Sequence, residues 1–147
     1  MSVENLGLGV VGAGYWGKNI VRNFTRVKGA ELRMVADLSD ANRERARSLA
    51  PEAKVVDDFS ALLGSPDIDA VAVCTPATSH YELAREALLA GKHAFVEKPL
   101  TLEGDHADEL VSLAAERGLT LMVGHLMIHH PAIRWIKQQI TSGEIGD

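Results

Sequence analysis

The sequence predicts an α/β fold in which a parallel sheet is doubly wound by helices. Short apolar segments alternate six times with segments of helical period, and short loops join them. The first apolar segment, Leu6–Val11, runs directly into three glycines spaced as Gly12-x-Gly14-x-x-Gly17, and a helical pattern follows at once. Right-handed crossovers between these strands favour the Rossmann order 3-2-1-4-5-6.

The first half of the chain contains three strands with their helices. Leu6–Val11 is apolar almost throughout, as expected of a parallel strand that is covered on both faces. Ser39 or Asp40 is suited to cap the second helix. The expected order is strand Leu6–Val11, helix Tyr15–Val27 with Val27 on its inward stripe, strand Glu31–Ala36, a helix after the cap Ser39 or Asp40 that ends at about Leu49, strand Ala53–Val56 and helix Phe59–Leu63.

The second half repeats the pattern, and a glycine follows two of its helices. Gly91 and Gly118 are expected to stop those helices. Cys74, the single cysteine, is interpreted as a core residue. The expected order is strand Ile68–Cys74, a helix capped by Thr78 or Ser79 and ending at Ala90, strand His93–Val96, a helix from the cap Thr101 to Arg117, strand Leu119–Val123 and helix Pro131–Ser142.

Composition and charge narrow the class of protein. The length of 147 residues suits one domain, and the net charge of -5 predicts no general attraction to nucleic acid or to an anionic membrane. No apolar run approaches the roughly 20 residues that span a bilayer. The N-terminus lacks the basic stretch of a secretory signal, and a lone cysteine forms no internal disulfide, so a cytoplasmic location is expected.

The glycine pattern predicts a dinucleotide site. Gly12 permits a tight turn after the strand, Gly14 lets a pyrophosphate approach the backbone, and Gly17 lets the helix pack close to the sheet. Asp37 stands about 20 positions further on, where a carboxylate can accept the ribose hydroxyls of an adenosine and would repel a 2′-phosphate. Leu38 follows where a basic residue would favour NADP. The expected cofactor is therefore NAD; the alternative is that Asp37 only caps the next helix.

Polar residues follow three further strands, whose carboxyl ends must share one rim of the sheet. Lys98 is the favoured catalytic residue, because an ammonium group at a partly buried rim loses hydration and can exchange a proton with a substrate hydroxyl. Glu97 would orient the nicotinamide ribose or hold Lys98, and an ordinary ion pair is the alternative. The rim residues are Thr75, Pro76, His80, Glu97, Lys98, Gly124 and His125.

Three side-chain roles stay open at this point. Tyr15 and Trp16 lie in the glycine turn, where they either cover the phosphate site or pack on a neighbouring loop. His125 faces cofactor or substrate, or is structural. No metal site is expected at His125, His129 and His130, because no carboxylate or cysteine is close in sequence and Pro131 places the last two histidines in a loop.

Several motifs together resemble one family, that of glucose–fructose oxidoreductase, inositol dehydrogenase and rhizopine catabolism (Gfo/Idh/MocA). They are VVGAGYWGKN, TPATSHYELA, VEKPL and VGHLMIHHPAIRWIKQQITSGEIG, in that order. The resemblance implies NAD(P)-dependent redox chemistry at a sugar, cyclitol or nucleotide-sugar carbon, with the branch that oxidises nucleotide-linked sugars the most similar. The resemblance also implies a role for each candidate site residue. At the adenosine end, Gly12, Gly14, Tyr15, Trp16 and Gly17 would hold the pyrophosphate and Asp37 the adenosine ribose. Thr75, Pro76 and His80 would lie along the cofactor. At the other end, Glu97 would act at the nicotinamide, Lys98 at the reacting hydroxyl, and Gly124 and His125 would border the substrate.

The resemblance covers only the first half of family members. We therefore expect residues 1–128 to form the cofactor-binding domain and 129–147 to lead toward a substrate domain that is missing here. Such a truncated domain would bind NAD without completing catalysis, and the longer enzyme would be a homo-oligomer. Exposed apolar residues of the last helix would favour association. The alternatives are a binding module without turnover and an NAD-dependent glycosidase of the same family.

Overall fold

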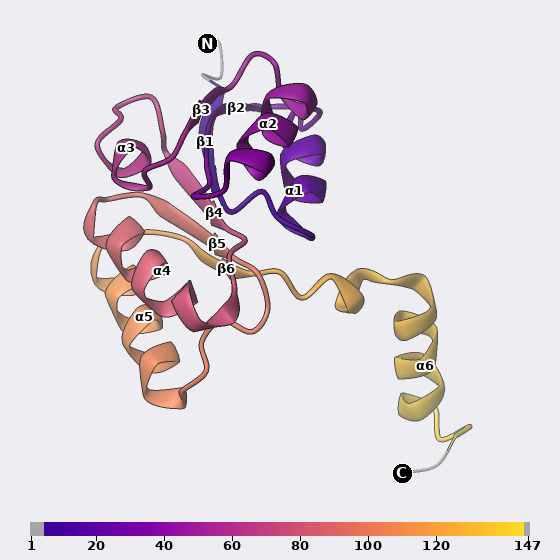
Figure 1. The fold of residues 1–147 in the computed structure, drawn as a ribbon. Helices are drawn as coiled ribbons and strands as arrows, with labels where there is room; N and C mark the ends of the chain where they lie inside the picture. The colour runs from indigo at the N-terminus through magenta and orange to yellow at the C-terminus, as the bar shows by residue number, and fades with distance from the viewer. Residues whose placement is uncertain (1–4, 146–147) are drawn as a thin grey trace.

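The computed structural model describes residues 5–145 and shows one sheet of six parallel strands in the order β3-β2-β1-β4-β5-β6 (Figure 1). This order confirms the predicted doubly wound fold. The strands are β1 (Leu6–Val11), β2 (Ala30–Ala36), β3 (Lys54–Val56), β4 (Ala70–Val73), β5 (His93–Val96) and β6 (Leu121–Val123).

Helices cover both faces of the sheet (Figure 1). One face carries the core of α1 and α2, and the other carries the core of α3, α4 and α5. Gly91 and Gly118 end their helices with φ angles of 76° and 64°, as predicted. The helices are α1 (Gly17–Phe24), α2 (Asp40–Leu49), α3 (Ser60–Leu63), α4 (His80–Leu89), α5 (Gly104–Glu116) and α6 (Pro131–Thr141), with short 3-10 turns η1 (Ala77–Ser79) and η2 (Leu126–His129).

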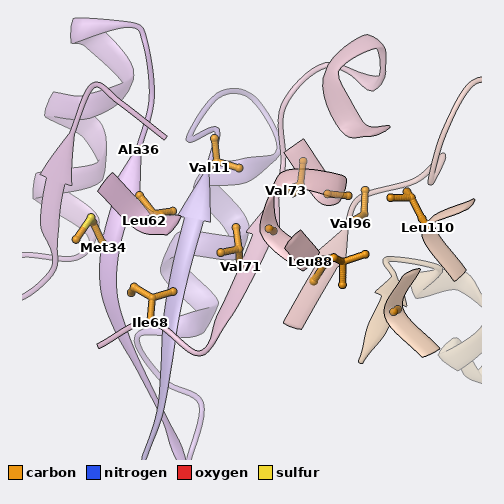
Figure 2. Close-up of a cluster of buried hydrophobic side chains, with 14 residues drawn as sticks. Val11, Met34, Ala36, Leu62, Ile68, Val71, Val73, Leu88, Val96 and Leu110 are labelled. Carbon is orange, nitrogen blue, oxygen red and sulfur yellow. The ribbon is translucent and has the colours of Figure 1, made fainter. Parts of the chain in front are cut away.

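The two cores hold the strands in a register that aligns their carboxyl ends. Figure 2 shows Val11, Val73 and Val96 within the core under α3, α4 and α5. In the sheet Val11 pairs with Val73, Val73 pairs with Val96, and Val96 pairs with Val123. The residues that follow these positions therefore emerge along one rim.

Two predicted helix starts are wrong. The first helix begins at Gly17 rather than Tyr15, because the turn after β1 occupies the intervening residues, and it ends at Phe24. Val27 lies beyond that end and is 45% exposed instead of facing inward. The fifth helix begins at Gly104, since the Thr101 hydroxyl donates to the Glu103 carbonyl (2.6 Å) instead of capping a helix.

The segment after β6 leaves the body of the fold. Helix α6 stands apart from the sheet and its main contacts are with η2 (Figure 1). As predicted, its apolar side chains are exposed, namely Ile133, Trp135, Ile136 and Ile140. Within residues 5–145, no helix has the length and apolar character needed to cross a membrane.

Candidate functional site

The glycine turn is built around two glycines that the fold requires and one that it does not. Gly12 has a φ of 90°, and a Cβ on it would lie 2.8 Å from the backbone of Cys74. A Cβ on Gly17 would lie 1.9 Å from the carbonyl oxygen of Gly12, so the helix could not approach the strand. A Cβ on Gly14 would meet only the Asn42 amide, at 3.8 Å. The space above Gly14 is thus open to a ligand, as a pyrophosphate at the N-terminus of α1 would need.

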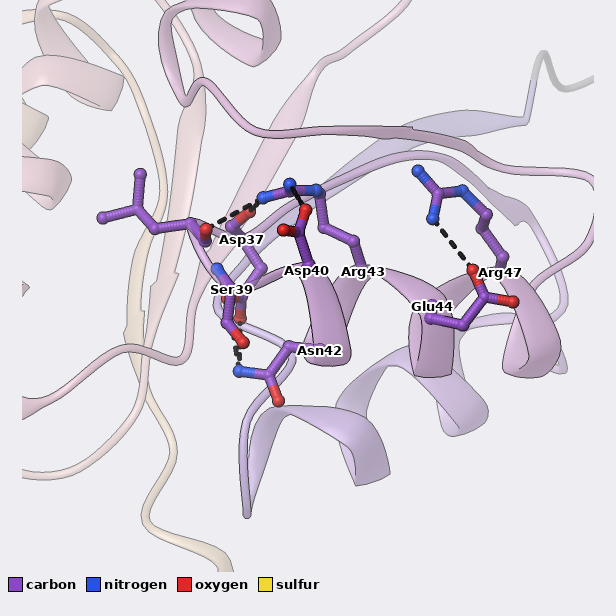
Figure 3. Close-up of polar contacts among 8 residues, drawn as sticks. Asp37, Ser39, Asp40, Asn42, Arg43, Glu44 and Arg47 are labelled. Atoms are coloured by element: carbon purple, nitrogen blue, oxygen red, sulfur yellow. Dashed lines mark hydrogen bonds and ion pairs between the residues drawn. The ribbon is translucent and has the colours of Figure 1, made fainter.

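Asp37 ties the end of β2 to this turn. Figure 3 shows its surroundings at the start of α2, with Ser39 and Asn42. Its Oδ2 accepts the Ala13 backbone N–H at 2.7 Å, and its Oδ1 accepts the Ser39 N–H at 2.8 Å. The Asn42 amide donates to both oxygens at 3.2 Å. The carboxylate therefore contacts the start of α2, as the capping alternative proposed, and also fixes the glycine turn.

The loop beyond Asp37 is closed by Arg43 (Figure 3). Its guanidinium donates to the carbonyl oxygens of Asp37 (2.7 Å) and Leu38 (2.9 Å), and it also pairs with Asp40. The Leu38 side chain is exposed. The Arg43 guanidinium therefore lies at the end of β2, but it is already paired with two carbonyl oxygens and a carboxylate of the protein.

The ends of β4, β5 and β6 surround a cavity of about 980 Å³. It collects most of the predicted rim residues from segments far apart in sequence. Pro76 and Tyr15 are outside its lining, and Tyr15 is exposed beneath the Lys18 ammonium (5.3 Å). The lining consists of Trp16, Cys74, Thr75, Ala77, His80, Glu97, Lys98, Pro99, Gly124, His125, Leu126, Met127 and Ile128.

Glu97 is the buried carboxylate of this cavity. Its side chain accepts a hydrogen bond from the Trp16 indole N–H at 2.7 Å, which crosses from the glycine turn. The sequence placed Trp16 either over the phosphates or on a neighbouring loop. The structure brings it to the end of β5, 81 positions away.

Lys98 and His125 are both exposed at the cavity mouth. The expected partial burial of Lys98 is wrong: Glu97 is buried, whereas Lys98 and the next residue, Pro99, are exposed. No side-chain hydrogen bond or ion pair links Glu97 to the Lys98 ammonium in the part of the chain that the structure describes. The Lys98 and His125 side chains are thus accessible to a ligand.

His80 joins two strand ends from inside the cavity wall. Its ring is almost fully buried, with Nε2 2.9 Å from the Thr75 carbonyl oxygen and Nδ1 2.7 Å from the Pro99 carbonyl oxygen. The ring therefore spans the loop after β4 and the loop after β5.

Cys74 has a second role besides the predicted one, and one wall of the cavity was not predicted. Cys74 packs against the core of α1 and α2, as expected, but it is only half-buried and also lines the cavity. Burial, with a smaller effect from the Glu97 charge, raises the pKa of its thiol to about 12, so the thiol is neutral. The missed wall is the apolar run Leu126–Ile128, which could have been noticed as three apolar residues directly after a strand end.

The histidines near the end of the chain do not assemble a metal centre. His130 caps α6 by accepting the Ala132 N–H at 3.2 Å. Within residues 5–145, no three His, Cys, Asp or Glu side chains are gathered closely enough to hold a metal ion.

Comparison with known proteins assigns this arrangement to a family. The profile described as "Oxidoreductase family, NAD-binding Rossmann fold" matches residues 6–125. UDP-N-acetylglucosamine 3-dehydrogenase of Acidithiobacillus ferrooxidans is 38% identical over 132 residues, covering 88% of this chain and 40% of that protein. Inositol 2-dehydrogenase of Serratia proteamaculans is 34% identical over 145 residues, covering 97% of this chain and 43% of that protein.

Solved structures agree with this assignment. The scyllo-inositol dehydrogenase of Lactobacillus casei, with bound NAD(H) and scyllo-inositol, superposes with a TM-score of 0.86 at 30% identity, covering 97% of this chain and 43% of that one. The 3-ketoreductase KijD10 of Actinomadura kijaniata, in complex with NADP and TDP-benzene, has a TM-score of 0.86 at 32% identity, covering 94% and 42%.

These relatives share the fold but differ in cofactor and are much longer. One structure holds NAD(H) and the other holds NADP, so the similarity does not choose between the two dinucleotides. The chain spans about 40% of the length of the curated relatives that it matches. The chain belongs to the Gfo/Idh/MocA family of NAD(P)-dependent sugar oxidoreductases, and residues 6–125 are its NAD-binding Rossmann fold.

Proposed function

We propose that this protein binds NAD(H) and serves a dehydrogenase that transfers a hydride between nicotinamide and a hydroxyl-bearing carbon of a sugar or nucleotide sugar. The observation that carries the proposal is the shared rim: the open space at Gly14 and the cavity around Glu97 and Lys98 lie along the carboxyl ends of adjoining strands. Residues 1–128 would form the cofactor domain, with 129–147 connecting it to substrate-binding parts of a longer, oligomeric enzyme.

Asp37 supports the choice of NAD over NADP. Its carboxylate lies 2.7 Å from the backbone of the glycine turn, at the place where the adenosine ribose of a bound dinucleotide is expected. A 2′-phosphate would bring a second negative charge close to it. The nearby Arg43 is engaged with backbone carbonyls and Asp40, so it compensates poorly.

The nicotinamide end supports redox chemistry. A bound nicotinamide would accept or donate the hydride. Glu97, held in the cavity wall, is placed to accept a ribose hydroxyl, while the exposed Lys98 is placed to exchange a proton with the substrate hydroxyl. His125 borders the same mouth. The names of the relatives support a sugar, cyclitol or nucleotide sugar as the substrate class.

Calorimetric titration of the chain with NADH and NADPH tests the cofactor assignment. We expect NADH to bind at least about tenfold more tightly, because a repulsion of about 1.4 kcal/mol corresponds to that factor. Asp37→Ser should remove the preference, whereas Asp108→Ser, at an exposed position of α5, should keep it. Tighter binding of NADPH would contradict the choice of NAD, and no binding of either would contradict the proposed function.

A further inference from the structure

One hydrogen bond connects the two halves of the proposed cofactor site. Trp16 follows Gly14 in the turn after β1, and its side chain reaches the end of β5, where the indole Nε1 lies 2.7 Å from Glu97 Oε1. An indole N–H can only donate, and an ionised carboxylate can only accept. Trp16 is therefore the donor and Glu97 the acceptor of this hydrogen bond.

The indole is the best-placed donor that Glu97 has. The Glu97 residue is 8% exposed, and burial of a carboxylate is costly unless donors compensate it. The other donor is the backbone N–H of Lys98, at 3.3 Å from Oε2. None of the ion pairs found over residues 5–145 includes Glu97.

The surroundings leave the carboxylate little freedom. Gly124 packs so closely that a Cβ there would lie 3.1 Å from Glu97 Oε2 and 3.1 Å from the Phe95 ring. Oε1 is held by Trp16 on the other side. Oε1 accepts the short indole contact, whereas the single partner of Oε2 among the described residues is the longer contact to the Lys98 N–H, so Oε2 is the more weakly satisfied oxygen.

We infer that Trp16 is a positioning residue that fixes Glu97 and leaves Oε2 to accept a hydroxyl group of the nicotinamide ribose. This role rests on the proposed function. It couples the two ends of the site, because the turn that would bind the pyrophosphate also orients the carboxylate at the nicotinamide end. Trp16 would thus act on ribose binding without touching the ribose.

Substitutions that remove the indole N–H and keep an aromatic ring test the role. Trp16→Phe keeps an aromatic ring in the turn, and Trp135→Phe makes a comparable change on the exposed face of α6, away from the cavity. Each variant is titrated with NADH and with ADP, which lacks the nicotinamide ribose. We expect Trp16→Phe to weaken NADH binding about tenfold and to leave ADP binding unchanged, whereas Trp135→Phe changes neither.

A double-mutant cycle with Glu97→Ala separates positioning from other effects. If Trp16 acts through Glu97, Trp16→Phe should have little further effect on NADH affinity in the Glu97→Ala background. Equal weakening of NADH and ADP would show that Trp16 acts on the turn alone and would overturn the inference. Unchanged or tighter NADH binding by Trp16→Phe would also overturn it, because the indole would then be dispensable or would compete with the ribose.

A spectroscopic readout tests the contact without any cofactor. The chain has two tryptophans, so Trp16 is the only one in the Trp135→Phe variant. Adding Glu97→Ala should shift the Trp16 emission, and an unchanged spectrum would refute the contact. If the wild-type chain binds NADH and Trp16→Phe binds it equally well, the positioning role alone fails; if the wild-type chain does not bind NADH, the proposed function fails.

Discussion

The two sides of the rim differ in how far the chain satisfies its own polar groups. On the side of β1 and β2, the Asp37 carboxylate receives backbone N–H groups from Ala13 and Ser39, and the end of β2 is closed by Arg43. On the side of β5 and β6, Lys98 and His125 are exposed beside a cavity. We call the side of β1 and β2 the prearranged side, because the fold itself satisfies its polar groups. We call the side of β5 and β6 the open side, because its side chains are exposed to a ligand.

This difference assigns different tasks to the two sides. A carboxylate that backbone donors already hold in place binds a ligand at little further entropic cost, which suits the constant part of a cofactor. Exposed side chains suit the part of the site where substrates enter and protons move. The Trp16–Glu97 hydrogen bond is the point at which the two sides meet.

The largest expected effect separates two glycines on the prearranged side. Gly17→Ala should abolish cooperative unfolding or cost more than about 4 kcal/mol, because its Cβ would lie 1.9 Å from the Gly12 carbonyl oxygen. Gly14→Ala should leave the folding free energy almost unchanged and weaken NADH binding. Thermal melts followed by circular dichroism, with NADH titration of the folded variant, measure both.

Two results would contradict the different roles assigned to Gly17 and Gly14. Equal melting temperatures for Gly17→Ala and the wild type would show that the helix can shift away from the strand. Loss of folding in Gly14→Ala would show that the space above Gly14 is needed by the protein rather than by a ligand. Either result would break the distinction between fold-required and ligand-required positions.

The next effect concerns the open side. In the longer enzyme that contains this chain, Lys98→Ala should lower kcat about 10²- to 10⁴-fold if the ammonium exchanges a proton with the substrate. NADH affinity should change much less, since Lys98 is exposed and its ammonium makes no hydrogen bond or ion pair to the described residues. Absorbance of NADH during sugar oxidation gives the rate. Lys28→Ala, an exposed lysine just before β2, is the control.

The prearranged side was the easier one to predict from sequence. The strand Leu6–Val11, the glycine spacing and Asp37 lie within about 30 positions, and each has a local physical reason. The strand order followed from the same alternation and is confirmed. Only the start and end of the first helix were wrong, because its periodic pattern continues into the turns on both sides.

The open side depends on contacts that local patterns do not encode. The position of Trp16 required knowledge of a partner 81 positions away. Glu97 is buried and its neighbour Lys98 is exposed, and Glu97 packs against Gly124 of another strand end, a contact between residues distant in sequence. Cys74 was expected in the core because it extends an apolar strand, yet the strand ends one residue earlier.

The smallest expected effect tests how completely the prearranged side is filled. A carboxylate offers about four acceptor sites, and Asp37 already receives Ala13, Ser39 and the Asn42 amide, which lies 3.2 Å from both oxygens. Ribose hydroxyls must then replace the weakest donor, and Asn42 is the only side-chain donor to Asp37 among the described residues. Asn42→Ala should tighten NADH binding about threefold in the same titration, with Asn23→Ala as the control. Weaker binding would mean instead that Asn42 contributes a contact to the cofactor.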